Sequence, residues 1–201
     1  MSKFLTQNPI ILASASKIRI QLLTSLGINF DVVPAVCDEE VIKKALKTAS
    51  MLELASTLAQ YKALEVSSRY PNHFIIAADQ LCIIGDKYLD KPLSHAVAVT
   101  HLRLLRGKTH QQLSAYCIAK AGDLLWQDHD IATLTMRELN DNTIDAYLKQ
   151  EQPYHSCGAY HFEGLAKWLF TDIQGNESTI LGLPLMPLAQ ALIKLKAVDL
   201  T

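Results

Sequence analysis

The feature that most constrains the fold is an apolar segment of strand length, residues 74–84 (Phe-Ile-Ile-Ala-Ala-Asp-Gln-Leu-Cys-Ile-Ile), bounded by Pro71-Asn72 and Gly85-Asp86. A continuous apolar run of this kind predicts a strand buried on both faces. Asp79 interrupts the run, and a carboxylate inside such a strand is costly unless a metal ion or a cation compensates it. The alternative is a strand that ends at Ala78 and leaves Asp79 in a solvated turn.

Composition points to a globular protein without a general affinity for polyanions or membranes. The chain has 201 residues, of which 49% are hydrophobic and 19% charged, and its net charge is −1. We therefore predict one domain over residues 1–201, in two lobes, that binds neither nucleic-acid polymers nor membranes. No apolar run approaches the roughly 20 residues of a membrane span, and the N-terminus lacks the apolar region of a signal peptide. The four cysteines form no C-x-x-C pair, which indicates reduced thiols in a cytoplasmic protein.

A candidate phosphate-binding segment begins at Ser14. Ser16 is a natural N-cap for a helix predicted over residues 17–26. Lys17 and Arg19 fall in the first turn of that helix, where the helix dipole disfavours cations. A bound phosphate would remove this conflict, because two serine hydroxyls, free backbone N–H groups and two cations would surround it. The alternative is a plain capped helix whose cations are solvated.

Three carboxylates follow a predicted strand at residues 30–33. Asp38, Glu39 and Glu40 are expected in a loop just past the end of that strand. Ligands of α/β proteins bind at such strand ends, and Mg²⁺ and Mn²⁺ prefer carboxylate oxygens. The triplet is therefore a candidate metal site, although a lone acidic triplet is more often solvated surface.

Two lysines stand out further along the chain. A helix predicted over residues 50–67 places Lys62 on the same stripe as Ala55 and Leu58. Lys62 is either a lysine that extends its ammonium to solvent or a cation directed into an anionic site. Lys91 is held extended by the proline that follows it.

The rest of the chain is predicted to contain both helices and strands. The sequence predicts a helix over 94–105, a hairpin of strands 111–120 and 124–136, a helix over 141–150, a glycine-punctuated aromatic loop at 154–164 that could wrap a base, a strand over 167–173 and a helix over 187–196.

The unusual charged residues together suit a polyphosphate with a divalent metal ion. The chain has no G-x-x-x-x-G-K-[ST] loop and no G-x-G-x-x-G motif, which argues against a P-loop NTPase and a dinucleotide oxidoreductase. It also lacks the nucleophile-elbow motif of serine hydrolases. The remaining chemistry is metal-assisted attack of water on phosphorus.

Several short segments, in order along the chain, resemble the Maf family of nucleoside triphosphate pyrophosphatases. Each segment is weak alone, whereas the ordered set covers nearly the whole chain and is specific. The matching segments are residues 12–19 with Leu22-Leu23 and Gly27, Asp38-Glu39, 58–63, Ala78-Asp79-Gln80, Lys91-Pro92, 105–110, 158–164 and 182–185.

The resemblance implies a fold and a reaction. The implied fold is α/β and similar to inosine triphosphate pyrophosphatases, with an elongated mixed sheet flanked by helices and a cleft between two lobes. The implied reaction converts a nucleoside triphosphate to the monophosphate and pyrophosphate with a divalent metal, Mg²⁺ or Mn²⁺.

The motif match also implies residue roles. Asp79 is implied to accept a proton from the attacking water, and Glu39, helped by Asp38, to bind the metal. The implied triphosphate-binding residues are Ser14, Ser16, Arg19, Lys62 and Lys91.

Three positions tied to substrate choice in the family depart here from its commonest form. They are Ile18, where arginine is frequent, Gln80, where threonine is frequent, and Glu163, where glutamine is frequent. The Gln80 and Glu163 pair resembles the branch that acts on 7-methylguanosine triphosphate, because a carboxylate can accept two N–H donors from a guanine edge. Ile18 fits the apolar stripe of its helix equally well. Ser156 stands where many members carry lysine, so a cation on the phosphate side is missing.

Other functions remain open at this point. The chain could be a nucleotide-binding regulator of septum formation with little turnover, a pyrophosphatase for thymidine or uridine triphosphates, or an interaction protein with a decayed pocket. The resemblance also leaves a homodimer possible.

Overall fold

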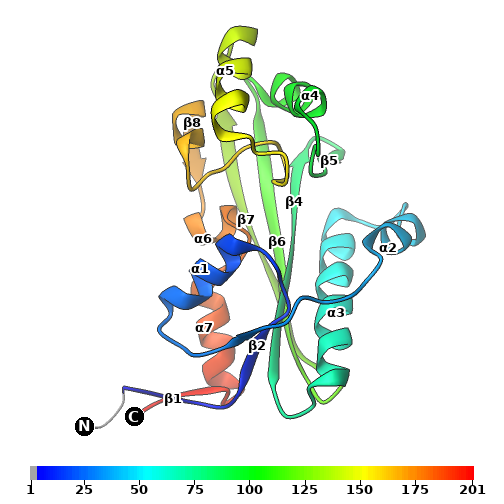
Figure 1. The fold of residues 1–201 in the computed structure, drawn as a ribbon, viewed down its shortest axis with the longest axis vertical. Helices are drawn as coiled ribbons and strands as arrows, with labels where there is room; N and C mark the ends of the chain where they lie inside the picture. The colour runs from blue at the N-terminus through cyan, green and yellow to red at the C-terminus, as the bar shows by residue number, and fades with distance from the viewer. Residues whose placement is uncertain (1–3) are drawn as a thin grey trace. The chain divides into compact units, whose positions relative to one another are not determined.

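The computed structural model describes residues 4–201, which fold into an α/β arrangement of helices around a mixed sheet, as predicted (Figure 1). The sheet has seven strands in the order β3-β2-β4-β6-β7-β8, with β5 paired to β4 outside this path. The strands are β1 (Leu5–Gln7), β2 (Ile10–Leu12), β3 (Asp31–Val32), β4 (Phe74–Ile84), β5 (Lys87–Leu89), β6 (Thr109–Lys120), β7 (Asp123–Met136), β8 (Phe170–Gln174) and β9 (Val198–Leu200). The helices are α1 (Lys17–Ser25), α2 (Glu39–Ala45), α3 (Met51–Arg69), α4 (His95–Leu105), α5 (Asp141–Glu151), the 3₁₀ helix η1 (Leu165–Leu169), α6 (Glu177–Ile180) and α7 (Leu185–Lys194).

The chain forms two compact units. Unit 1 contains the residues up to Asp79, Ser114–Asp130 and Gly182–Thr201, and unit 2 contains Gln80–Leu113 and Ile131–Leu181. Within residues 4–201 no helix is both long and apolar enough to cross a membrane.

The first part of strand β4, residues 74–79, forms the centre of unit 1. Its side chains alternate between two cores, as the pleat of a strand requires. Ile75 and Ala77 pack into a cluster with α3, whereas Ile76 and Ala78 pack into a second cluster with α1 and α7. Figure 1 shows α3 and α7 on opposite sides of this part of the sheet. The predicted strand, buried on both faces, is therefore confirmed.

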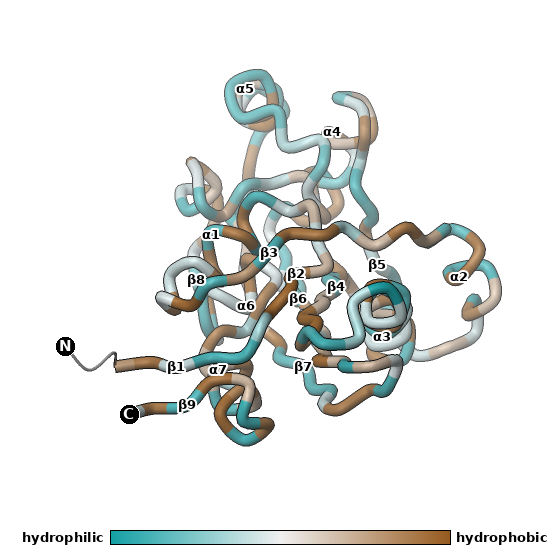
Figure 2. The backbone as a smooth tube through the Cα atoms, turned by 60° about the horizontal axis from the view of Figure 1, so that its bottom comes forward, coloured by the Kyte–Doolittle hydropathy of each residue, from teal (hydrophilic) through white to brown (hydrophobic). Residues whose placement is uncertain are grey.

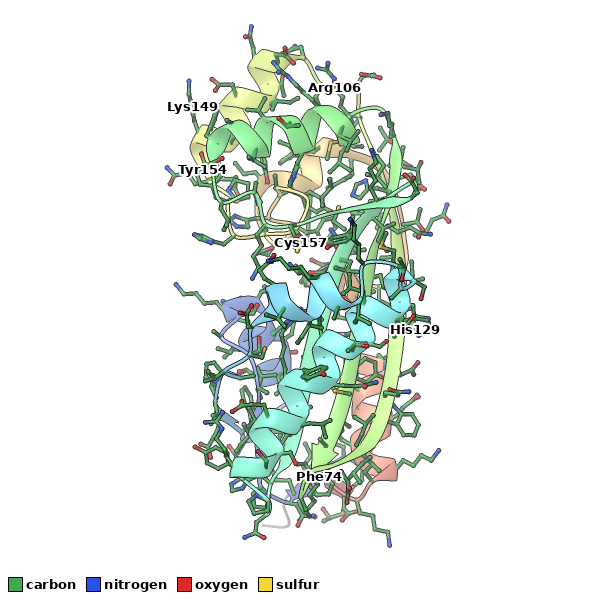
Figure 3. All side chains as sticks on the ribbon, turned by 90° about the vertical axis from the view of Figure 1, so that its right-hand side faces the viewer. Phe74, Arg106, His129, Lys149, Tyr154 and Cys157 are labelled. Carbon is green, nitrogen blue, oxygen red and sulfur yellow. The ribbon has the colours of Figure 1, made fainter. Side chains whose placement is uncertain are left out.

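Three short strands of three residues each, β1, β5 and β9, were not predicted from the sequence. β1 and β9 pair antiparallel, with Leu5 opposite Leu200, and lie side by side in Figure 2. Three residues are too few to show a period in the sequence. At the start of β4, the ammonium of Lys120 lies 4.1 Å from the centre of the Phe74 ring (Figure 3).

The aromatic loop belongs to the core of unit 2. Tyr160 and Phe162 are only 4% and 5% exposed, and both rings contact Phe170. The prediction that this loop's rings could wrap a base is therefore wrong for these two residues, because they are committed to packing.

Two predicted boundaries are also wrong. Residues 38–40 are not a loop, since α2 begins at Glu39 and Asp38 is its N-cap. An aspartate at the N-cap and acids in the first turn favour a helix start, so the same triplet stabilises α2. The strand predicted from Lys167 begins only at Phe170, because Ala166 and Leu169 are buried at the three-residue spacing of η1.

Candidate active site

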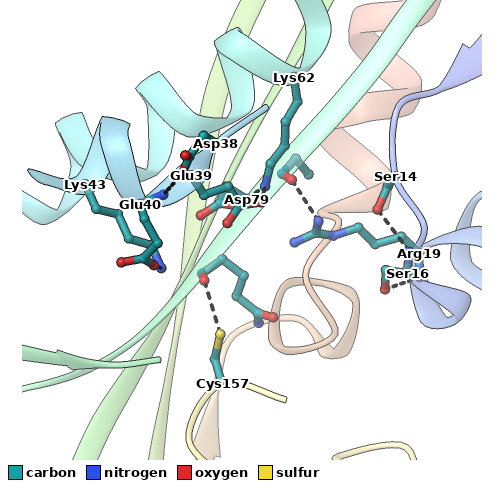
Figure 4. Close-up of polar contacts among 12 residues, drawn as sticks. Ser14, Ser16, Arg19, Asp38, Glu39, Glu40, Lys43, Lys62, Asp79 and Cys157 are labelled. Atoms are coloured by element: carbon teal, nitrogen blue, oxygen red, sulfur yellow. Dashed lines mark hydrogen bonds and ion pairs between the residues drawn. The ribbon is translucent and has the colours of Figure 1, made fainter. Parts of the chain in front are cut away.

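A buried cation lies between two carboxylates in unit 1. The Nζ atom of Lys62 is 2.6 Å from Oδ1 of Asp79 and 2.9 Å from Oε1 of Glu39 (Figure 4). Asp79 is only 8% exposed, and β4 continues past it to Ile84. The alternative of a solvated turn at Asp79 is therefore wrong, and the predicted need for a compensating charge is met by Lys62.

The electrostatics of this cluster keep Lys62 charged. Burial alone would lower the pKa of Lys62, and the nearby Arg19 acts in the same direction. The carboxylates of Asp79 and Glu39 outweigh both effects, so the pKa of Lys62 is raised above its ordinary value. The lysine is thus a fixed positive charge at neutral pH.

Arg19 connects α1 to the backbone beside Asp79. Its Nη1 donates to the carbonyl oxygen of Ala78 at 2.7 Å (Figure 4). Its Nε donates to the carbonyl oxygen of Gly182 at 2.9 Å. These contacts could not be predicted from the sequence, because Gly182 is 163 positions away. Arg19 therefore fixes the backbone that carries Asp79, besides bringing a positive charge to this region.

The serines of the predicted phosphate cradle make local contacts. The hydroxyl oxygen of Ser16 accepts from the backbone N–H of Arg19 at 3.4 Å, and that of Ser14 accepts from the N–H of Ser16 at 3.2 Å. Ser16 is thus the predicted N-cap of α1, while Lys17 is exposed. Ile18 is half-buried.

The predicted metal ligands do not form a complete cage. Asp38 uses Oδ1 to accept from the N–H groups of Glu40 at 3.1 Å and Val41 at 3.2 Å. Among residues 4–201, no three His, Cys, Asp or Glu side chains are grouped so that they could hold a metal ion. Glu39 still fits a magnesium ion of the kind that takes one or two carboxylates and completes its shell with water and substrate phosphates.

Two of the three predicted specificity residues, Gln80 and Glu163, lie in unit 2, as does Lys91. The Nε2 group of Gln80 donates to the carbonyl oxygen of Ile180 at 2.6 Å and, more weakly, to that of Thr179 at 3.4 Å. Its amide orientation is therefore set by the backbone of α6, a contact that the sequence did not predict. Glu163 is exposed in the loop before η1, and Lys91 is exposed in the segment between β5 and α4.

Comparison with known proteins identifies the family. The family model described as Maf-like protein matches residues 9–195.

This chain belongs to the Maf family.

Several curated relatives in this family carry the same name. A protein of Legionella pneumophila (strain Corby) named nucleoside triphosphate pyrophosphatase is 58% identical over 200 residues, which is 100% of both chains. Proteins of the same name from Nitrobacter winogradskyi and Rhodopseudomonas palustris (strain BisB18) are 41% and 39% identical over 90% and 94% of both chains. The Maf resemblance predicted from the sequence is thus confirmed.

Proposed function

We propose that this Maf protein is an enzyme that hydrolyses a nucleoside triphosphate to its monophosphate and pyrophosphate. The shared name of its full-length relatives supports this reaction class. The observation that carries it in the structure is the buried Lys62 ammonium held between the Asp79 and Glu39 carboxylates. A pair of carboxylates with a fixed cation is the charge arrangement that metal-assisted hydrolysis of a phosphoanhydride needs.

In this proposal Asp79 is the general base. Lys62 donates to Oδ1 of Asp79, which leaves Oδ2 to accept the proton of the attacking water. The positive charges of Lys62 and Arg19 offset the negative charge of the triphosphate. Ser14 and Ser16, at the N-terminus of α1, and Lys91 are proposed to bind phosphate oxygens.

Glu39, with help from Asp38, would hold a Mg²⁺ or Mn²⁺ ion. When bound, such an ion polarises the phosphate and neutralises developing charge. Asp38 acts as a supporting residue here, since its N-cap contacts fix the first turn of α2 where Glu39 lies.

We further propose that the substrate carries a guanine-type base, such as 7-methylguanine. Gln80 commits its NH₂ group to backbone carbonyls, so its amide oxygen is the hydrogen-bonding group that remains for a substrate. Glu163 is also an acceptor. Two acceptors match the two adjacent N–H donors of a guanine edge. They match thymine or uracil less well, because those bases offer a single N–H between two carbonyl groups.

A pyrophosphate-release screen tests both the proposed reaction and the proposed base of the substrate. Purified full chain is assayed with GTP, 7-methylguanosine triphosphate, dTTP and UTP, each with Mg²⁺, Mn²⁺ or a chelator. We expect the methylated guanine nucleotide to be preferred and release to stop without metal. Asp79→Asn should lower release at least about 100-fold, the size of a lost general base. The matched Asp145→Asn variant, in an exposed ion pair of α5, should not.

Other outcomes point to the competing functions. Thermal stabilisation by nucleotide and metal without any release would favour a nucleotide-binding regulator of cell division. Preference for dTTP or UTP would overturn the assignment of the base alone. If no nucleotide stabilises the protein, a non-catalytic interaction protein becomes the better description.

A further inference from the structure

Unit 2 contains a pair of cysteines that the proposed hydrolysis does not use. Cys82 lies on β4 and is fully buried, whereas Cys157 lies in the loop between α5 and η1 and is half-buried (Figure 3). Both are thiols in the structure. They are 75 positions apart in the sequence, so only the fold brings them together.

The loop backbone packs directly on the Cys82 thiol. A Cβ atom placed on Gly158 would lie 2.7 Å from Sγ of Cys82, and Gly158 has the left-handed φ of +79° that favours glycine. Since consecutive Cα atoms are about 3.8 Å apart, Cα of Cys157 lies within about 8 Å of that sulfur. No side chain fits between the loop and Cys82 at this point.

The Cys157 thiol lies against the same stretch of β4. Its Sγ is 3.6 Å from the carbonyl oxygen of Gln80, to which it donates (Figure 4). Residues 157 and 158 therefore run along the strand from Gln80 to Cys82. A small movement of the loop would bring the two sulfur atoms together.

The surroundings of the two thiols assign them different roles. Burial raises the pKa of the Cys82 thiol strongly, and the neighbouring Cys157 raises it further. Cys82 is thus a poor first target for an oxidant. Cys157 is less buried, so it can react with the oxidant first, and Cys82 then reacts with the oxidised Cys157.

We propose that Cys82 and Cys157 form a reversible disulfide when a peroxide oxidises the protein, and that this bond slows nucleotide hydrolysis. The effect on hydrolysis rests on the proposed function, whereas the bond itself does not. The disulfide would link the loop between α5 and η1, which contains Glu163, to strand β4, which contains Gln80. Oxidation also withdraws the Cys157 sulfur from the Gln80 carbonyl.

The chemistry balances with hydrogen peroxide as the oxidant. The Cys157 sulfur attacks one peroxide oxygen, the O–O bond breaks, and a sulfenic acid and one water form. The Cys82 sulfur then attacks the sulfenic sulfur, the S–O bond breaks, and the departing hydroxide takes the Cys82 proton as a second water. Two thiols are oxidised to one disulfide while one peroxide is reduced to two waters. A dithiol reagent reverses the change.

The test follows bond and activity separately in the full chain. Reduced protein is treated with hydrogen peroxide, blocked with N-ethylmaleimide, digested and analysed by mass spectrometry. We expect a cross-linked peptide joining Cys82 to Cys157 and, when thiols are counted in denaturant, a fall from four to two. We also expect kcat/KM for pyrophosphate release to fall about tenfold, a barrier change of about 1.4 kcal/mol, and to recover with dithiothreitol.

Three variants sharpen the result. Cys157→Ala should give neither the cross-link nor the loss of activity, while Cys37→Ser, which removes the other half-buried cysteine, should retain both. A Cys37→Ser/Cys117→Ala double variant leaves only the proposed pair and should behave like the wild type.

Absence of the cross-linked peptide overturns the proposal, and so does a cross-linked protein with unchanged kcat/KM. Reduced protein that releases no pyrophosphate counts against the proposed function instead. The mass spectra then still decide whether the bond forms.

Discussion

Lys62 lies within hydrogen-bonding distance of two carboxylates from different elements, Asp79 on β4 at 2.6 Å and Glu39 on α2 at 2.9 Å. The lysine itself comes from α3, so one ammonium group joins three elements of unit 1. Its side chain is only 12% exposed, and that of Asp79 only 11%. Removal of the ammonium would leave two carboxylates together with little water around Asp79.

Lys62→Met should therefore destabilise the fold as well as stop the reaction. Loss of one partner of a buried ion pair leaves an uncompensated charge, and we expect the free energy of unfolding to fall by about 3 kcal/mol. Urea denaturation at neutral pH measures this change. Lys149→Met, in an exposed ion pair with Asp145, is the matched control and should alter stability by less than about 1 kcal/mol. Equal stability of the two variants would show that Lys62 has no structural role.

The stabilisation by Lys62 should also have a defined pH range. The pKa of Lys62 is raised in the folded protein above its ordinary value of 10.5. The folded state thus binds the proton more tightly, so this contribution is fully present below about pH 10.5 and is lost as the pH rises through the folded pKa. The stability difference between wild type and Lys62→Met should be constant from about pH 7 to 9. A difference that disappears within that interval would contradict the pairing.

Arg19→Lys tests whether this residue positions the backbone next to Asp79. A lysine ammonium lacks the fork that reaches the Ala78 and Gly182 carbonyls together, so one buried acceptor loses its partner. We expect a loss of about 1–3 kcal/mol in unfolding free energy and a lower kcat. Arg69→Lys, in an exposed pair with Glu65, is the control and should change neither quantity. A raised KM with unchanged stability would indicate a phosphate contact alone.

The sequence was informative wherever a local rule determines the structure. The apolar run predicts β4 to both of its ends, and Ser16, Ser50 and Ser94 are observed at the N-caps of α1, α3 and α4. Asp79 is a carboxylate inside this apolar run, and that alone was sufficient to predict that a cation or a metal ion compensates its charge. These signals depend on neighbours within a few positions.

The contacts that complete the candidate site could not be predicted in this way. The hydrogen bonds of Arg19 with Gly182 and of Gln80 with Ile180 join positions 163 and 100 residues apart. They depend on how helices and turns approach β4, for which the sequence has no periodic signal. Asp38 shows the opposite failure, since a local signal for a helix N-cap was interpreted as part of a loop.

Gln80→Glu should be poorly tolerated despite its small change in shape. The new carboxylate would face the carbonyl oxygens of Ile180 and Thr179, which now accept from the Gln80 NH₂ group. We expect a loss of about 1–3 kcal/mol in unfolding free energy near neutral pH, because acceptors would oppose one another. Gln127→Glu, at an exposed glutamine of β7, serves as the matched control. A variant as stable as this control would show that the α6 contacts do not orient the amide.

His110 should make the protein sensitive to acid. It is 2% exposed, its Nε2 lies 3.0 Å from the Tyr160 hydroxyl, and burial lowers its pKa to about 4. Gln112 donates to the same hydroxyl oxygen at 2.6 Å, so we infer that the neutral ring accepts the Tyr160 proton at Nε2. Protonation of the ring would replace this acceptor with a donor and place a charge in an apolar core.

The sign of the pH dependence follows from the lowered pKa. The unfolded chain binds a proton near pH 6.5 and the folded chain only near pH 4, so this contribution is present above about pH 6.5 and is lost as the pH falls towards 4. The full shift corresponds to about 3 kcal/mol. Denaturation curves of wild type and His110→Gln at about pH 7, 6, 5 and 4.5 measure it. The variant should lose less stability on acidification, whereas His129→Gln, at an exposed histidine, should follow the wild type. Only the neutral ring is accommodated by both Tyr160 and the surrounding core, so parallel stability curves for His110→Gln and wild type would contradict this account of His110.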